Sequence, residues 1–369
     1  MPLNCDAYDR IAVIGSGSWG TALASVAATA GRQVRLYGRD AEVIAGIAAH
    51  RRNARYLPDV DLPPGLDATT VMARALEDAD AVLMVVPSGA VRSVASQVRA
   101  HLAPGTPVAI CTKGIEAGTG LLMSQVAADE LGNFPVGTIS GPTFARETAL
   151  GHPTAATVAF DFSHQDRLAP HTSPAARLAV SMSTASFRTY ISDDLVGVEV
   201  GGAIKNVIAI ACGMMTGAGY AENTRAALIT RGLDEMKRLA EALGGRRETV
   251  TGLAGAGDLT LTCSSQTSRN MSLGFQLGQG LDRKDCFDGT AIVVEGEANA
   301  ASVVDLARRV NVQMPICETV DAILHRGAPL DTAFADLWAR PIEGEPRALE
   351  INLPHPALQA ARLGKGVLS

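Results

Sequence analysis

The turn Gly15-Ser-Gly17-Ser-Trp-Gly20, between a short apolar run and a helical segment, constrains the fold more than any other feature. Residues 10–14 are typical of a buried strand, and residues 21–30 of a helix. In such a unit the first glycine permits the tight turn, the second lets a pyrophosphate approach, and the third allows close packing. The helix N-terminus attracts the anion. The unit therefore predicts a dinucleotide site at Gly15, Gly17 and Gly20, and the alternative is a glycine turn without a ligand.

Further apolar runs continue this pattern through the first half of the chain. The runs that we interpret as strands are Gln33–Tyr37, Ala81–Val86, Pro107–Thr112 and Gly137–Ser140. Helical segments, at residues 41–50, 91–102 and 121–131, lie between them. Uninterrupted apolar strands are typical of parallel strands covered on both faces. The alternation predicts an α/β fold with a doubly wound sheet, which binds ligands beyond the carboxyl ends of its strands.

The end of the second predicted strand bears on the choice of cofactor. NAD-selective sites usually carry an acidic residue there, which binds the ribose hydroxyls. Here the strand is followed by Gly38, Arg39 and Asp40. Arg39 suits a 2′-phosphate and favours NADP, whereas Asp40 keeps NAD possible. An exposed loop arginine is the alternative interpretation of Arg39.

The second half of the chain is predicted to be helical. A strand pair at Thr154–Phe160 and Phe187–Ile191 precedes a change of pattern near Asp193, and no convincing strand follows. The predicted helices are Leu195–Met215, Thr224–Leu243, Ser272–Gln279, Gly296–Val310 and Pro315–His325. We therefore expect a sheet domain at residues 1–193, an all-α domain at 194–343 and an extended tail at 344–369.

Lys205 is the most unusual residue of the helical half. From Leu195 to Tyr220 only Glu199 and Lys205 are charged. A buried ammonium is costly unless it is paired, hydrogen-bonded or able to lose its proton. This predicts a functional role for Lys205 and the adjacent Asn206. The alternative is a lysine whose stem covers apolar surface while its ammonium reaches water.

Other candidates occur in loops. Lys113 follows a predicted strand, and the loop at residues 141–145 follows the next, so both are expected at the ligand-binding edge of the sheet. Asp258 lies in a glycine-rich loop, and Arg269 suits a phosphate because guanidinium makes paired charged hydrogen bonds. Glu295 opens a predicted helix. The alternative for Lys113 is a solvent-exposed lysine, and the alternative for the loop with Asp258 and Arg269 is a flexible connection with a solvent-exposed arginine. For Glu295 the alternative is a charge interaction with the helix end.

Composition excludes several classes of partner. The net charge of −6 disfavours nucleic acid and anionic lipid. The longest uncharged run, Asn206 to Ala221, is shorter than the ~20 residues of a typical membrane span, so we expect no membrane insertion. The six cysteines lack zinc-site spacing, and the first residues lack the apolar core of a secretory signal. We expect a cytoplasmic protein without a metal.

Several segments together identify a family. GSGSWGTALA, CTKGIE, GPTFARE, GVEVGGAIKNVIAIACG, GLAGAGDLTLTC, SRN and VVEG occur in the order found in NAD(P)-dependent glycerol-3-phosphate dehydrogenase of the bacterial soluble type. The resemblance runs from about Arg10 to about Glu343. It implies reversible interconversion of sn-glycerol 3-phosphate and dihydroxyacetone phosphate for phospholipid synthesis. It also implies a helical domain like that of 6-phosphogluconate dehydrogenase, and a homodimer.

The resemblance assigns roles to individual residues. It places the proton acceptor on Lys205 and implies that Lys113 and Asp258 assist catalysis. The implied substrate contacts are Lys113, Gly141, Thr143, Lys205, Asn206, Asp258, Thr262, Ser268, Arg269 and Asn270. Beyond the three glycines, the implied cofactor contacts are Ser18, Trp19, Arg39, His50, Tyr56, Lys113, Ala145, Arg269, Val293 and Glu295. Of these, His50 and Tyr56 lie where the family is variable.

Two other functions fit parts of the sequence. One is another two-domain dehydrogenase of the hydroxyacid or phosphogluconate type, although those families carry different residues around the lysine. The other is a protein that senses NADP without chemistry. Such a sensor has little use for Lys113, Lys205, Asp258 and Arg269 together.

Overall fold

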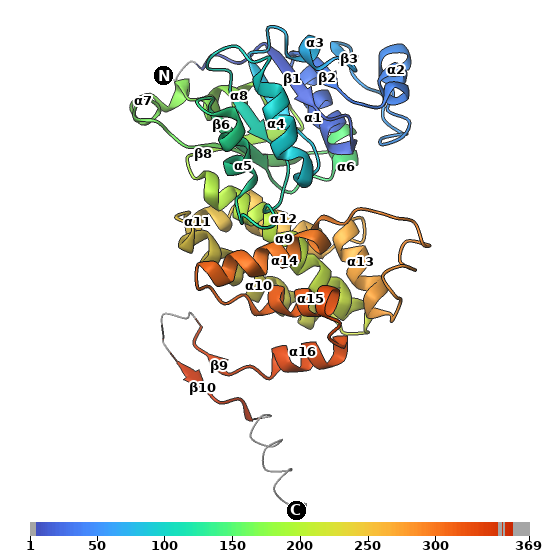
Figure 1. Cartoon of the computed structure of the whole chain (residues 1–369), viewed down its shortest axis with the longest axis vertical. Coiled ribbons are helices and arrows are strands. Elements are labelled where there is room, and N and C mark those ends of the chain that lie inside the picture. Colours follow the sequence, from blue (N-terminus) through green and yellow to red (C-terminus); the bar gives the residue numbers. More distant parts are fainter. Residues whose placement is uncertain (1–4, 346–348, 350, 357–369) are drawn as a thin grey trace, which may run out of the picture.

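The computed structural model describes residues 5–345, 349 and 351–356. Figure 1 shows two parts, a sheet domain with the N-terminal half of the chain and a helical domain below it. The predicted two-part fold is confirmed. Strand β8 ends at Ser192 and helix α9 begins at Leu195, and the predicted domain boundary at 193/194 lies between them.

Eight strands form the sheet, in the order β3-β2-β1-β4-β5-β6-β7-β8. All neighbours are parallel except β6 and β7. The strands are β1 (Arg10–Ile14), β2 (Gln33–Tyr37), β3 (Leu66–Thr69), β4 (Ala81–Met84), β5 (Val108–Ile110), β6 (Val136–Ser140), β7 (Thr154–Phe160) and β8 (Phe187–Ser192). In the register, Ile14 lies beside Tyr37 and Met84, so the loops after β1, β2 and β4 leave the same edge of the sheet.

Helices cover both faces of this sheet. They are α1 (Ser18–Thr29), α2 (Ala41–His50), α3 (Met72–Leu76), α4 (Val91–Arg99), α5 (Met123–Leu131), α6 (Ala145–Ala149), α7 (His164–Leu168) and α8 (Pro174–Met182), with short 3-10 turns at Ser88–Ala90 and Pro170–Thr172. On β1, Ile11 and Val13 pack into one core with α1 and α8, whereas Ala12 and Ile14 pack into the other with α4 and α5. This two-sided burial explains the uninterrupted apolar character of the strand.

The prediction omitted five elements of the sheet domain, namely β3, α3, α6, α7 and α8. Strand β3 is short, lies at the edge of the sheet and has the weakly apolar sequence LDAT. Helix α3 has only five residues. Helix α8 supplies the parallel connection from β7 to β8, and its buried face includes Leu178 and Met182. The predicted strand pair is confirmed.

Helix α9 (Leu195–Gly217) is the centre of the helical domain. Around it lie α10 (Glu222–Ala242), α11 (Arg247–Val250), a π-helical turn (Leu253–Gly257), α12 (Asp258–Cys263), α13 (Arg269–Gly278), α14 (Glu295–Arg309), α15 (Pro315–Arg326) and α16 (Leu330–Trp338). Among the described residues, α9 is the one helix that is both long enough and apolar enough to cross a membrane. However, 94% of its most apolar window is buried inside the protein. A helix that is apolar on every side is expected in such a core.

The end of the helical domain differs from prediction. Residues Ile342–Glu343 (β9) and Asn352–Leu353 (β10) form a short antiparallel pair, although no strand was predicted there. Figure 1 shows this pair below α16, away from the sheet domain. Glu343 is held by Arg231, at 3.2 Å. Most of the predicted tail, at 346–348, 350 and 357–369, lies outside the described residues.

Candidate active site

Lys205 lies in the middle of α9 and only 7% of it is exposed. Its Nζ donates hydrogen bonds to Asp258 Oδ1 and to Thr262 Oγ1, each at 2.8 Å. Burial lowers the pKa of Lys205, Asp258 opposes that change, and the ammonium of Lys113 lowers the pKa further. The buried lysine is therefore paired, and its environment favours loss of the proton.

Asp258 is shared by two lysines. Its Oδ2 accepts a hydrogen bond from Lys113 Nζ at 2.5 Å, while Oδ1 binds Lys205. Burial would raise the pKa of Asp258, but the two lysines outweigh it and hold this pKa below its ordinary value. Lys113 follows β5 of the sheet domain, whereas Lys205 and Asp258 belong to the helical domain. One buried carboxylate therefore joins the two domains and orients both cations.

Close backbone packing makes this arrangement possible. Asp258 begins α12 directly after the π-helical turn, and Thr262 is one helical turn further along. A Cβ added at Gly201 would lie 2.8 Å from Ala254 O in the π-helical turn. One added at Gly202 would lie 3.2 Å from Lys113 Cγ. Both glycines precede Lys205 on α9, and they let the π-helical turn and the stem of Lys113 approach it.

Side-chain amides connect three helices beside the lysines. Asn206 Nδ2 donates to Glu295 Oε2 at 3.1 Å, and Asn206 Oδ1 accepts from Asn270 Nδ2 at 2.9 Å. Asn270 Oδ1 in turn accepts from Gly296 N at 2.8 Å. The chain of bonds holds Asn206, next to Lys205, against the starts of α13 and α14. The structure thus brings together Asn206, Asn270 and Glu295, and it gives each amide a partner within the protein.

The start of α13 presents a cation. Arg269 is the first residue of this helix, is exposed, and donates from Nη1 to Val293 O at 3.1 Å. Ser268 caps the helix by accepting from Met271 N. Val293 itself is 71% exposed. The predicted site residues Ser268, Arg269, Val293 and Glu295 therefore lie on one side of the helical domain.

The glycine turn after β1 fits a pyrophosphate. Gly15 has φ +124°, and a Cβ there would lie 2.1 Å from Val85 O. A Cβ at Gly20 would lie 1.8 Å from Gly15 O, whereas at Gly17 no atom of the described residues lies within 4 Å. Gly17 is the N-cap of α1 and has no side chain, so the first amides of the helix are left for an anion. Gly15 and Gly20 are therefore needed for the turn itself, whereas Gly17 leaves space for a ligand.

Other predicted cofactor contacts lie on α1, α2 and the loops after β2 and α2. Ser18 Oγ donates to Tyr56 O at 3.1 Å, and Trp19 packs against the sheet core. His50 ends α2 and is exposed, as is Arg39, which has no hydrogen-bond or ion-pair partner among the described residues. Asp40 caps α2 and pairs with Arg55 at 2.6 Å. The carboxylate of Asp40 is thus engaged, whereas the guanidinium of Arg39 is free to meet a ligand.

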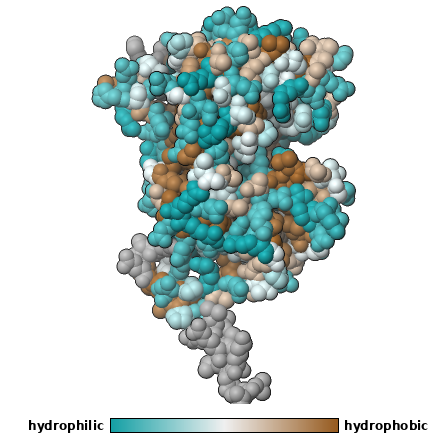
Figure 2. Space-filling view, viewed as in Figure 1, coloured by the Kyte–Doolittle hydropathy of each residue, from teal (hydrophilic) through white to brown (hydrophobic). Residues whose placement is uncertain are grey.

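The loop after β6 reaches the helical domain. Thr143 Oγ1 donates to Gly141 O at 3.2 Å, and Ala145 is the first residue of α6. A Cβ added at Gly257, in the π-helical turn, would be 3.6 Å from Pro142. The predicted residues of this loop therefore lie beside the π-helical turn that directly precedes Asp258. In the space-filling view the outline of the molecule narrows between the two domains (Figure 2).

Glu199 was noted for its charge but not predicted as part of the site. It is buried and accepts hydrogen bonds from Ser124 N, at 2.8 Å, and from Ser124 Oγ. Burial raises the pKa of Glu199 to about 7. This contact ties α9 to the start of α5 in the sheet domain. A charge in an apolar run was the only signal, because its partner lies 75 residues away.

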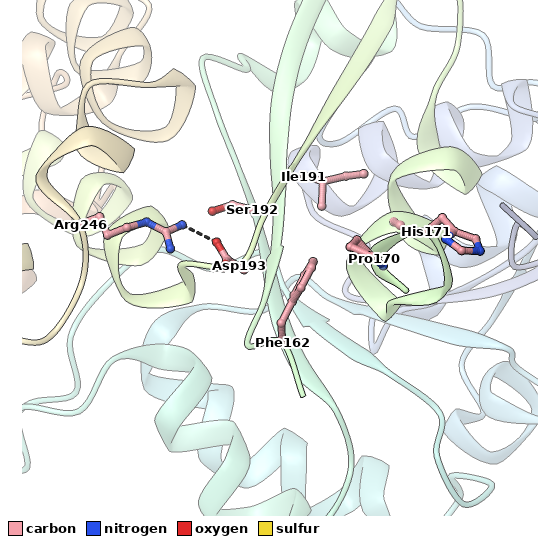
Figure 3. Close-up of a pocket in the computed structure, with 8 residues that line it drawn as sticks. Phe162, Pro170, His171, Ile191, Ser192, Asp193 and Arg246 are labelled. Atoms are coloured by element: carbon pink, nitrogen blue, oxygen red, sulfur yellow. Dashed lines mark hydrogen bonds and ion pairs between the residues drawn. The ribbon is translucent and has the colours of Figure 1, made fainter. Parts of the chain in front are cut away.

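A cavity of about 470 Å³ lies elsewhere, near the end of β8. Figure 3 shows Phe162, Pro170, His171 and Ile191 around it, with Arg246 paired to Asp193. None of the predicted site residues lines this cavity, so it is separate from the lysine pair. In the described part of the chain, no cluster of three or more His, Cys, Asp or Glu side chains is arranged to hold a metal.

Comparison with known proteins identifies the family. The model of the NAD-dependent glycerol-3-phosphate dehydrogenase N-terminus matches residues 10–166, and that of the C-terminus matches residues 194–335. The chain belongs to the NAD-dependent glycerol-3-phosphate dehydrogenase family. The resemblance seen in the sequence motifs is therefore confirmed.

Individual members of the family match over most of their length. Glycerol-3-phosphate dehydrogenase [NAD(P)+] of Rhodospirillum rubrum is 47% identical, over 91% of this chain and 94% of its own. That of Caulobacter vibrioides is 45% identical over 92% and 99%. The crystal structure of the Coxiella burnetii glycerol-3-phosphate dehydrogenase, 39% identical, covers 90% of this chain and 99% of its own with a TM-score of 0.81. D-mandelate dehydrogenase with NADH, 13% identical with a TM-score of 0.56, shares the fold alone.

Proposed function

We propose that the chain catalyses the reversible, nicotinamide-dependent interconversion of sn-glycerol 3-phosphate and dihydroxyacetone phosphate. The observation that carries this proposal is the pair Lys113 and Lys205, which share the buried carboxylate of Asp258. The names of the family members give the substrate, and the paired lysines give the chemistry it needs. We further propose that the protein acts in the cytoplasm as a homodimer and supplies glycerol 3-phosphate for phospholipid synthesis.

Lys205 is the proposed general acid and base. In oxidation its neutral amine removes the proton of the C2 hydroxyl, and in reduction its ammonium polarises and then protonates the ketone oxygen. The nicotinamide cofactor, when bound, supplies or accepts the hydride. A lysine starts near pKa ~10.4, and a catalytic base works best near the operating pH. Burial and Lys113 lower the pKa of Lys205 in the direction that this role requires.

Asp258 and Thr262 orient the amine. Both accept hydrogen bonds from Lys205 Nζ, which leaves the third direction of the ammonium for the substrate oxygen. Lys113 is proposed to contact the substrate from the sheet side. Gly141, Thr143, Asn206 and the start of α13 complete the proposed substrate site.

The proposed cofactor site begins at Gly15, Gly17 and Gly20. Ser18, Trp19 and Tyr56 extend it along α1 and the neighbouring loop, and Ala145, Val293 and Glu295 are proposed at the nicotinamide side. We propose NADP as the preferred cofactor, because Arg39 has no partner among the described residues whereas Asp40 is paired with Arg55. The names of the relatives include NAD as well as NADP, and we propose NAD as the second cofactor.

Arg39→Asp is expected to shift the preference from NADP toward NAD. An arginine that binds the 2′-phosphate contributes about 1.5–3 kcal/mol, so the ratio of kcat/KM for NADPH to that for NADH should fall roughly 10- to 100-fold. The measurement is initial-rate kinetics with dihydroxyacetone phosphate and each reduced cofactor. Arg188→Asp, on the exposed strand β8 at the other end of the sheet, is the control. An unchanged ratio in Arg39→Asp would show that this arginine does not read the phosphate.

Arg269→Ala is expected to weaken binding of the substrate phosphate. The variant should raise KM for dihydroxyacetone phosphate by roughly 10- to 100-fold, because a charged hydrogen-bond pair is lost. Arg308→Ala, an exposed arginine at the far end of α14, should behave as the parent. If the parent enzyme reduced unphosphorylated dihydroxyacetone as well as the phosphate ester, the assignment would be wrong.

One assay separates this function from its alternatives. Oxidation of NADPH or NADH should depend on dihydroxyacetone phosphate and should not occur with other hydroxyacid or phosphogluconate-type substrates. A sensor would bind NADP, as measured by calorimetry, but would oxidise neither cofactor. Light scattering of the purified protein tests the proposed dimer.

A further inference from the structure

Asn299 occupies a position between the two lysines that none of the site assignments includes. It lies on α14 one helical turn after Glu295, and 7% of it is exposed. Residues four apart on a helix share a face, so Glu295 and Asn299 both point toward α9. Glu295 binds Asn206 there. Asn299 makes two further bonds, and each reaches the backbone next to one of the lysines.

The two ends of the Asn299 amide contact different domains. Nδ2 donates to Ala203 O at 2.8 Å, on the turn of α9 that carries Lys205. Oδ1 accepts from Ile115 N at 2.9 Å, just after Lys113 in the sheet domain. A carboxamide is suited to this position because it offers a donor and an acceptor on one rigid plane. Asn299 thereby fixes the distance between the backbone near Lys113 and the backbone near Lys205.

The loop that carries Lys113 depends on this bond for its position. On the sheet side, Thr112 Oγ1 donates to Val86 O at 2.6 Å. Gly114 then has φ +152°, a value that side-chain-bearing residues rarely adopt. Directly after this glycine, Ile115 N is held by Asn299. Lys113 therefore lies between an anchor in its own domain and an anchor from the helical domain.

We propose that Asn299 is a positioning residue, which sets Lys113 against Asp258 and Lys205 by bridging Ile115 N and Ala203 O. The proposal rests on the proposed function, in which these three side chains act together. Lys205 faces charges from three elements: Asp258 on α12, Lys113 after β5 and Glu295 on α14. If Lys113 withdraws, Lys205 loses the cation that lowers its pKa and keeps the carboxylate that raises it. Loss of the bridge should therefore raise the pKa of Lys205 and move the pH dependence of the reaction to higher pH.

The first test is Asn299→Ala in the full chain, with Ser302→Ala as the matched control on the same helix. Ser302 is also buried, but it lies almost one turn beyond Asn299. We expect kcat for dihydroxyacetone phosphate to fall roughly 10- to 100-fold, as for a misplaced catalytic group, while the Kd of NADPH is unchanged. In the oxidation direction, the rise of kcat/KM with pH should shift to higher pH. Ser302→Ala should show neither change.

The second test does not depend on activity. Hydrogen exchange of the segment 112–122, measured by mass spectrometry, should become at least about tenfold faster in Asn299→Ala, because Ile115 N loses its acceptor. Asn299→Asp keeps an acceptor for Ile115 N but cannot donate to Ala203 O when ionised. It should retain slow exchange and still lose turnover. This variant serves as well if the alanine variant does not fold.

Each result has a separate meaning. Unchanged exchange in Asn299→Ala overturns the bridge. If Asn299→Ala exchanges faster but has a normal kcat and an unshifted pH profile, the proposal that Asn299 positions the two lysines is overturned. If the parent protein does not reduce dihydroxyacetone phosphate at all, the proposed function fails, while the exchange measurement still decides whether Asn299 holds the loop.

Discussion

Lys205→Ala is expected to lower kcat by about 10²–10⁴-fold in both directions, which is the usual contribution of a general acid or base. The amine is the only group proposed to exchange a proton with the C2 oxygen, and its loss leaves that proton without an acceptor. Affinity for the cofactor should stay near that of the parent, because the glycine turn lies in the other domain. Steady-state kinetics and calorimetry with NADPH measure the two quantities.

Two further variants control for charge and folding. Lys205→Arg keeps a cation, but its guanidinium does not lose its proton at accessible pH, so the activity should remain low. Lys237→Ala, on α10, removes a lysine outside the candidate site and should leave kcat unchanged. Near-normal turnover of Lys205→Ala would rule out the catalytic assignment.

Asp258→Asn is expected to have the second large effect, on stability as well as on rate. Removing one partner of a buried ion pair leaves charge without compensation, which costs about 3–5 kcal/mol. Lys113 is 18% exposed and reaches some solvent, so we expect the lower part of this range. Urea unfolding near pH 7 measures the change, with Asp305→Asn, an exposed carboxylate on α14, as the control. A loss of stability no greater than that of the control would contradict the shared-carboxylate arrangement.

The effect of Asp258→Asn should depend on pH in a defined direction. The folded parent holds the pKa of Asp258 below its ordinary value, so its stabilising contribution is present above the unfolded pKa of ~3.9. That contribution is lost as the pH falls through the folded pKa. The difference between variant and parent should thus be largest near neutrality and shrink in acid. It should also shrink at high pH, where the lysines lose their protons.

The same variant should also alter the pH profile of the reaction. Asp258 raises the pKa of Lys205 against the effect of burial, so its removal lowers that pKa further. The rise of kcat/KM for glycerol 3-phosphate oxidation should therefore move to lower pH, opposite in sign to the shift expected for Asn299→Ala. A shift to higher pH in Asp258→Asn would show that the carboxylate does not stabilise the ammonium.

The sheet was predictable where burial leaves a clear pattern. Strand β1 and the glycine turn combine an apolar run with three glycines, and this sequence predicts the turn, in which Gly15 has φ +124°. Strand β3 lacked such a pattern, because an edge strand of four residues needs few apolar side chains. Helix α8 was not predicted because it has only nine residues and directly follows a stretch, residues 161–173, that is rich in polar side chains.

The sequence predicts a set of candidate site residues, but it does not predict how they are arranged in space. Lys205 was conspicuous because it interrupts an apolar helix, and the resemblance supplied Lys113 and Asp258. Their meeting on one carboxylate depends on the packing of two domains across 145 residues of sequence. Asn299 gave no signal of its own, since a single asparagine on a helix is ordinary. Only the position of its amide between two backbones distinguishes it.

The π-helical turn at Leu253–Gly257 has a consequence for how this gene can vary. Each residue of an α-helix is rotated by about 100° from the one before it, so a one-residue deletion directly before α12 would change the direction of the side chains of α12 relative to the residues before it. Asp258 and Thr262 would then leave the side of α12 that meets Lys205. A side chain at Gly257 would meet only an ordinary contact, 3.6 Å from Pro142, whereas one at Gly255 would lie 1.9 Å from Val250 O, and a change in the length of the segment would move Asp258 itself. Descendants of this sequence should accumulate insertions and deletions in surface loops, while the count of residues between Gly252 and Asp258 stays fixed.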